Sequence, residues 1–165
     1  AQGVKVVAVS VMRNHPSSLN PRIKSNNLLN NVLAMQESLR RGGFEALMRN
    51  HRGEFVECSQ SNVFVVREGG VATPPLDAGL LPGITRAFVI RLARGIGIDV
   101  AERPLLDADL LAADEAFLTS TTKGIVPTTT IDDRKVGDGM PGTVTRRLMQ
   151  AFETRVKAHA SAGSR

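Results

Sequence analysis

FEALMRNHRGEFVECSQSNVFVVREGGVAT, residues 44–73, decides the fold class of this chain. Its apolar and β-branched residues fall into short runs, separated by Gly53 and by the pair Gly69-Gly70. Short apolar runs between glycine turn signals are typical of β-strands. The stretch therefore predicts a meander of four short strands, over residues 44–48, 54–57, 62–67 and 71–73.

The flanking sequence adds both strands and helices. Alternating apolar residues predict a strand over residues 4–12, and further strands over 98–103, 115–120 and 125–131. Helical spacing of apolar residues predicts helices over residues 25–41 and 141–159, and another that begins at residue 84 and is stopped by Gly95 and Gly97. Asp107 can cap a short helix over residues 107–113. Strand runs mixed with isolated helices favour a mixed α/β (α+β) domain, with a sheet curled towards a pseudo-barrel and helices packed on it.

Length and composition indicate one globular domain. The chain has 165 residues and 42% hydrophobic content, enough for a single core. We expect residues 1–158 to form this domain and residues 159–165 to form a flexible tail. No run approaches the roughly 20 apolar residues of a membrane span, so we expect a cytoplasmic protein that binds no membrane.

The charge and the rare residue types narrow the function classes. A net charge of +5, with scattered arginines and no Trp or Tyr, fits an anionic cofactor and carboxylate substrates better than nucleic acid. The single cysteine, Cys58, cannot form an internal disulfide. The three histidines, His15, His51 and His159, lack the spacing of a metal site, so we expect no metal.

Four places in the sequence carry groups that could do chemistry. Lys24 follows a proline-rich turn, and Glu57 ends a predicted strand. Gly83-Ile84-Thr85 opens a predicted helix, and Ser120-Thr121-Thr122 precedes a glycine; both offer amides and hydroxyls to an anion. An amine, an acid and two anion sites are the parts that bind pyridoxal phosphate.

Each of these places also has a plainer interpretation. Lys24 could be a solvated lysine near a helix start, and Glu57 an exposed glutamate on an edge strand. Either threonine-containing turn could simply cap a helix or close a turn. The combination of all four in one small domain is what favours a cofactor site.

The motifs around these residues resemble the class IV, or fold type IV, pyridoxal-phosphate enzymes. The resemblance rests on four ordered segments between about residues 4 and 155: IKSNNLLNNVLA, VECSQSNVF, LPGITR and ADEAFLTSTT. This family includes branched-chain aminotransferases, D-amino-acid aminotransferases and aminodeoxychorismate lyases. The resemblance implies the large domain of that fold and a homodimer.

The resemblance also implies a role for each candidate residue. Lys24 would form the aldimine with pyridoxal 5'-phosphate and then act as the base in transamination between an amino acid and a 2-oxo acid. Glu57 would hold the pyridine nitrogen, and Leu81 would pack against the ring. The remaining cofactor contacts, near the phosphate, would be Ile84, Thr85, Thr121 and Thr122.

Two departures from the family pattern leave alternatives open. Family members have a smaller N-terminal domain of roughly a hundred residues, which we expect to be absent from this sequence, so the chain could be a large-domain fragment. Leu28 stands where branched-chain enzymes carry a tyrosine, which resembles the D-amino-acid branch. The alternatives are a lyase that releases pyruvate, an inactive large domain that serves in assembly and, last, a basic binding module.

Overall fold

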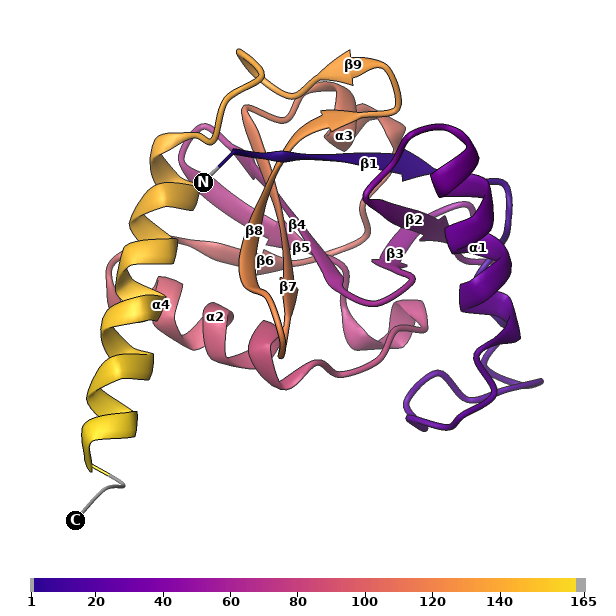
Figure 1. Cartoon of the computed structure of the whole chain (residues 1–165), viewed down its shortest axis with the longest axis horizontal. Helices are drawn as coiled ribbons and strands as arrows, with labels where there is room; N and C mark the ends of the chain where they lie inside the picture. Colours follow the sequence, from indigo (N-terminus) through magenta and orange to yellow (C-terminus); the bar gives the residue numbers. More distant parts are fainter. Residues whose placement is uncertain (1, 163–165) are drawn as a thin grey trace.

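A single strongly curled sheet organises the molecule (Figure 1). The computed structural model describes residues 2–162. Within this part, the strands are β1 (Val4–Ala8), β2 (Glu45–Arg49), β3 (Phe55–Cys58), β4 (Asn62–Arg67), β5 (Gly70–Thr73), β6 (Val100–Glu102), β7 (Glu115–Ser120), β8 (Gly124–Ile131) and β9 (Arg134–Lys135). The helices are α1 (Leu29–Arg40), the short 3-10 helix η1 (Leu76–Ala78), α2 (Ile84–Gly95), α3 (Asp107–Leu111) and α4 (Thr143–Ala162).

The order of the strands in the sheet differs from their order in the chain. The sheet runs β3-β2-β1-β8-β7-β4-β5-β6, and β9 pairs with β8. β1 is parallel to both of its neighbours, β2 and β8, whereas β7 is antiparallel to β8 and to β4. The sheet curls so strongly that β1 runs across the view of Figure 1 while β7 and β8 run down it. The predicted mixed α/β fold with a curled sheet is confirmed.

The predicted meander is wrong at its second connection. β2 pairs with β3 and β4 pairs with β5, but β3 lies at one edge of the sheet and β4 pairs with β7. The turn after β3 closes on itself, because the Cys58 amide donates to the Ser61 carbonyl at 2.7 Å. Asn62 then begins a ladder opposite Thr119. The turn therefore carries the chain from one part of the curled sheet to another.

Apolar clusters fill both sides of the sheet. α2 and α4 pack against each other and against β7 and β8. The core beneath them is centred on Phe64 and Phe117, whose rings stack with centroids 4.8 Å apart. A second cluster, which includes Val6, Leu47 and Leu118, lies within the curl of the sheet. Burial of these apolar surfaces is the main stabilising contribution to the fold.

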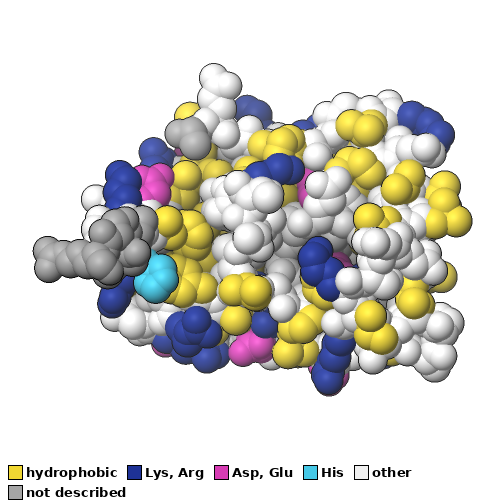
Figure 2. All heavy atoms as spheres, turned by 60° about the horizontal axis from the view of Figure 1, so that its bottom comes forward, with side chains coloured by type: hydrophobic (Ala, Val, Ile, Leu, Met, Phe, Trp, Pro, Cys, Tyr) yellow, Lys and Arg dark blue, Asp and Glu magenta, His cyan; other side chains and the backbone are white. Residues whose placement is uncertain are grey.

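Helix α1 buries the opposite face from the one that its sequence suggests. Its buried residues are Ala34 and Ser38, which pack on β1 and β2. The apolar residues that predicted the helix are largely exposed: Leu28 53%, Leu29 65%, Val32 47%, Leu33 47% and Leu39 62%. Figure 2 shows apolar patches at the right, the side on which α1 lies in Figure 1. Small side chains let α1 approach the sheet closely and leave its leucines facing outwards.

The C-terminal end of the described chain is helical. Helix α4 extends through residues 159–162, where the sequence suggests a flexible tail, and residues 163–165 lie outside the described residues. The tail therefore stays a prediction for those last residues. Among the helices of the described part, none is long and apolar enough to cross a membrane.

Candidate functional site

Several predicted site residues lie near one another, close to the end of β3, the start of β4 and the end of β7. Glu57 lies near the end of β3, and Asn62 begins β4 opposite Thr119, near the end of β7. The loop before α2 joins the same region, because the Asn62 side-chain amide donates to the Leu81 carbonyl at 3.1 Å. We call this region, formed by Glu57, Asn62, residues 81–85 and residues 119–122, the strand-end site.

Glu57 is the buried acid of the strand-end site. Its carboxylate accepts from Arg13 Nε at 2.6 Å and from the Leu81 amide at 3.0 Å, each on a different oxygen. The residue is only 5% exposed. Burial raises the pKa of the Glu57 carboxyl above its ordinary value, whereas the charge and hydrogen bond of Arg13 oppose that rise. A carboxylate has about four lone-pair sites, so Glu57 could accept a further hydrogen bond.

The start of α2, which we call the anion cradle, has the features of an anion-binding site. No side chain of the described residues caps this helix, whose N-cap residue is Gly83. The amides of its first turn therefore lack helical partners and carry the positive end of the helix dipole. The Thr85 hydroxyl lies in the same turn, and Thr85 is 8% exposed. A β-carbon at Gly83 would overlap Asn62 Oδ1, so glycine at this position lets Asn62 pack closely against the start of the helix.

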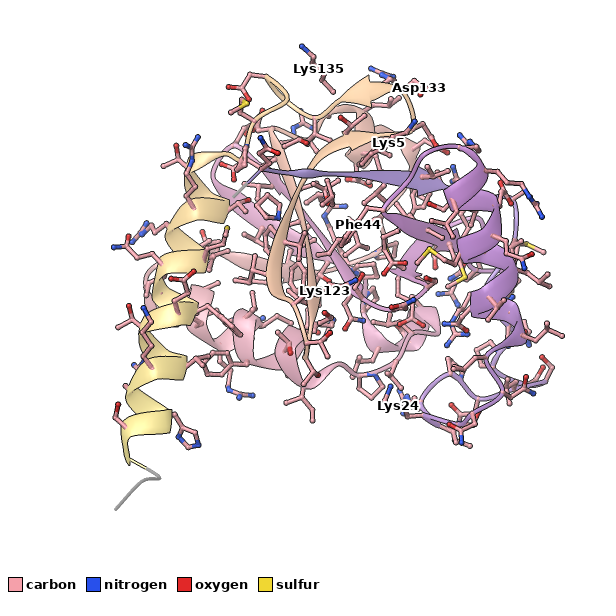
Figure 3. All side chains as sticks on the ribbon, in the orientation of Figure 1. Lys5, Lys24, Phe44, Lys123, Asp133 and Lys135 are labelled. Atoms are coloured by element: carbon pink, nitrogen blue, oxygen red, sulfur yellow. The ribbon has the colours of Figure 1, made fainter. Side chains whose placement is uncertain are left out.

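The second hydroxyl-rich segment lies in the turn between β7 and β8. Thr121 and Thr122 are exposed there, and the Lys123 amide donates to Ser120 Oγ at 3.3 Å. Within residues 2–162, the buried hydroxyl of Thr119 has no hydrogen-bond partner. Lys123 also lies at this turn, and its amine is 4.5 Å from the centre of the Phe44 ring. Both residues are labelled in Figure 3.

Lys24 lies on the exposed loop between β1 and α1, at the lower edge of Figure 3. The charged partner of Glu57 in this structure is Arg13, so the structure does not pair Lys24 with that carboxylate. Leu81 is half-buried beside Glu57, and Ile84 is 82% exposed at the helix start. The structure brings Glu57 and Leu81 together, while the role of Lys24 stays a prediction.

Sequence reasoning missed Arg13 and Asn62. Arg13 contacts Glu57, and Asn62 holds the loop that contains Leu81. One feature of the sequence could have pointed to Arg13 as a site residue: it is a charged residue directly after an apolar run, where a predicted strand ends and a loop begins. Asn62 is the first residue of a predicted strand, where no periodicity distinguishes it from a turn residue.

Other chemistries find little support in the described residues. The Cys58 thiol is buried, and burial raises its pKa well above the ordinary value, so it is unsuited to act as a thiolate nucleophile. Residues 2–162 contain no group of three or more His, Cys, Asp or Glu side chains that could hold a metal ion. An uncapped helix start beside a buried carboxylate instead fits a phosphate ester that carries a basic ring.

Comparison with known proteins identifies the family. Residues 1–131 match the family described as amino-transferase class IV, and the chain belongs to this family. A relative from Methanocaldococcus jannaschii is 41% identical over 151 residues, which cover 92% of this chain and 52% of the relative.

Solved structures agree with this assignment. The branched-chain amino acid aminotransferase of Escherichia coli superposes with a TM-score of 0.90 at 36% identity, over 93% of this chain and 51% of that one. Another branched-chain amino acid aminotransferase, solved with pyridoxamine 5'-phosphate, gives a TM-score of 0.87 at 32% identity, over 91% of this chain and 50% of that one. This chain thus spans about half the length of the relatives it matches.

Proposed function

We propose that this chain carries the cofactor-binding part of a pyridoxal-phosphate-dependent aminotransferase, which moves an amino group between an amino acid and a 2-oxo acid. The observation that carries the proposal is Glu57, a buried carboxylate with spare acceptor capacity beside the uncapped start of α2. Membership of class IV supports the same cofactor, as does the related structure solved with pyridoxamine 5'-phosphate.

The phosphate would bind at the start of α2. The backbone amides of Ile84 and Thr85, together with the Thr85 hydroxyl, offer donors to an anion at the positive end of the helix dipole. Thr121 and Thr122 would add hydroxyl contacts from the turn after β7. When bound, pyridoxal phosphate supplies an electron sink for the bonds around the substrate Cα.

The ring would lie between Leu81 and the Glu57 carboxylate. A carboxylate bonded to the ring nitrogen keeps that nitrogen protonated, which strengthens the electron sink. Lys24 would bind the cofactor and then move a proton at the substrate Cα. Because Lys24 lies on the exposed part of a loop, this role requires the segment after the anchored Arg13, residues 14–28, to turn towards Glu57 when the cofactor binds.

The direct test is chemical labelling of the lysine. The protein is mixed with pyridoxal phosphate, reduced with borohydride and digested, and the modified residue is identified by mass spectrometry. We expect the label on Lys24, its loss in Lys24→Ala and its retention in Lys123→Ala, a matched exposed lysine. A label that persists undiminished in Lys24→Ala would refute the role of Lys24.

The proposed substrates are branched-chain amino acids, by analogy with the names of the Escherichia coli enzyme and of the enzyme solved with pyridoxamine 5'-phosphate. Leucine, isoleucine and valine with 2-oxoglutarate should give glutamate, whereas D-alanine should give little. Glutamate formation from D-alanine alone would favour the D-amino-acid branch instead. Pyruvate release from aminodeoxychorismate without an amino acceptor would favour the lyase.

Two further expectations belong to this proposal. A homodimer would cover the exposed apolar side chains of α1, such as Leu29 and Leu39, which are 65% and 62% exposed. Sedimentation of the protein, with and without cofactor, measures the oligomeric state directly.

A cytoplasmic location, where amino acids and 2-oxo acids are interconverted, completes the proposal and is measured by fractionation of the source cells.

A further inference from the structure

The ion pair between Arg13 and Glu57 is almost entirely removed from solvent. Arg13 Nε lies 2.6 Å from Glu57 Oε1, and the side chains are 12% and 6% exposed. The other charged pairs of the described residues each include a side chain that is at least 36% exposed. A buried carboxylate is costly unless a cation or several donors compensate it.

Arg13 is itself held in place by neutral groups. Its Nη1 donates to Asn30 Oδ1 at 3.4 Å and to Asn31 Oδ1 at 3.3 Å, at the start of α1. The Arg13 amide donates to the Arg49 carbonyl of β2 at 2.8 Å. The asparagine bonds hold the guanidinium, the bond to Arg49 holds the backbone of Arg13, and Nε is left to donate to Glu57.

The remaining titratable neighbours of Glu57 do not compensate its charge. Glu45, on β2, is 1% exposed and binds the Ser59 and Ser61 hydroxyls. Its negative charge and the burial of Glu57 both favour the protonated form of the Glu57 carboxyl. Cys58 is a buried, neutral thiol. Arg13 is therefore the cation that opposes protonation of Glu57.

We propose that Arg13 is a positioning residue that keeps the Glu57 carboxyl charged and leaves one of its lone pairs directed to the ring nitrogen of the cofactor. The inference rests on the proposed function, because it assigns Arg13 a role through Glu57. Without Arg13, the buried carboxyl would take up a proton and would no longer stabilise a protonated ring nitrogen. Arg13 also belongs to the loop that carries Lys24, so it joins the acid to the segment that supplies the amine.

The first test measures the charge of Glu57 without any cofactor. Carbon-13 NMR of side-chain carboxyls, with the Glu57 signal assigned from Glu57→Gln, gives the titration midpoint in the cofactor-free protein. We expect Arg13→Met to raise this midpoint by about 1–3 pH units, the usual effect of losing an opposite charge at this distance. Arg13→Lys keeps the positive charge, so its Glu57 midpoint should lie close to that of the wild-type protein. Arg103→Met breaks the more exposed pair with Asp109 and should leave the Glu57 midpoint unchanged.

The second test links Arg13 to the cofactor through Glu57. Binding of pyridoxal phosphate is titrated for Arg13→Met, Glu57→Gln and the double variant. If Arg13 acts through Glu57, the double variant should bind no more weakly than Glu57→Gln alone, because the two changes remove the same interaction. Fully additive losses would assign Arg13 an independent contact with the cofactor and overturn its positioning role.

The outcomes separate this inference from the proposed function. An unchanged Glu57 midpoint in Arg13→Met overturns the inference even if Lys24 is labelled by the cofactor. Failure of Lys24 to be labelled, with a raised midpoint, leaves the ion-pair coupling intact and refutes the enzymatic role. If Arg13→Met does not fold, the same carbon-13 titration of the wild-type protein provides the test. A Glu57 carboxyl that is protonated at pH 7 in the wild-type protein overturns the inference.

Discussion

Replacement of Gly83 by alanine probes the geometry of the anion cradle. The backbone φ of Gly83 is −63°, which alanine adopts without strain, so the effect comes from space alone. An added β-carbon would lie well inside 3.0 Å of Asn62 Oδ1, 3.3 Å from Asn62 Cγ and 3.4 Å from Arg86 Cβ. Asn62 is 6% exposed and holds Leu81 through its side-chain amide, so it cannot move without losing that bond.

The size of the effect follows from two costs. Overpacking of a filled site costs about 1–3 kcal/mol. Breaking the bond from Asn62 to the Leu81 carbonyl leaves a buried donor without a partner, which costs about 1–3 kcal/mol more. We therefore expect Gly83→Ala to lower the free energy of unfolding by about 2–6 kcal/mol and to weaken binding of pyridoxal phosphate.

Urea unfolding followed by circular dichroism measures the stability, and absorbance titration measures cofactor binding. Gly95→Ala is the matched control, since Gly95 ends the same helix and an added β-carbon there meets nothing within 4 Å. This control should be neutral or slightly stabilising, by up to about 1 kcal/mol. If Gly83→Ala is as stable as Gly95→Ala and binds cofactor normally, the cradle geometry is wrong.

Three more predictions concern the buried acid, the aromatic core and helix α1. Because burial raises the pKa of Glu57, the folded state holds the proton of the Glu57 carboxyl more tightly than the unfolded chain does. Protonation of Glu57 therefore stabilises the fold fully below the ordinary glutamate pKa of about 4.3, and this stabilisation is lost as the pH rises through the pKa of Glu57 in the folded state. Urea unfolding should therefore show a smaller loss of stability between pH 4 and pH 7 in Glu57→Gln than in wild type, and a larger loss would contradict the sign. Phe117→Ala, which removes a ring stacked on Phe64, should cost about 3–5 kcal/mol in the same assay, and a cost below about 1 kcal/mol would argue against that core. On α1, Ala34→Leu should cost about 1–3 kcal/mol because Ala34 is buried, whereas Leu39→Ala should stay within about 0.5 kcal/mol; the reverse order would show that the helix packs through its leucine face.

Local patterns in the sequence predicted several elements closely. The strands Asn62–Arg67 and Glu115–Ser120 were predicted with their observed bounds, because alternation and flanking turn residues delimit them. The start of the helix Ile84–Gly95 was predicted correctly from the Pro82-Gly83 break, and Gly95 and Gly97 located its end closely. These elements depend on residues that are near one another in the chain, which is the range over which periodicity is informative.

Long-range pairing explains what could not be predicted. The strand predicted over residues 4–12 ends at Ala8, where its register with Leu47 of β2 ends. Helical spacing located α1 but not its buried face, because close packing on β1 selects the small side chains Ala34 and Ser38. The partner of Glu57 was missed for the same reason, since Arg13 lies 44 residues earlier and only tertiary structure brings the two together.

The position of β1 between β2 and β8 has a consequence for biosynthesis. β1 can pair with β2 early in synthesis, because β2 follows it closely in the chain. The other side of β1 stays unpaired until β8, residues 124–131, leaves the ribosome, which takes on the order of ten seconds at usual translation rates. During that interval the nascent chain exposes an unpaired, apolar strand edge of the kind that invites aggregation. A chaperone that shields residues 4–8 co-translationally would therefore raise the yield of native protein more than one supplied after release.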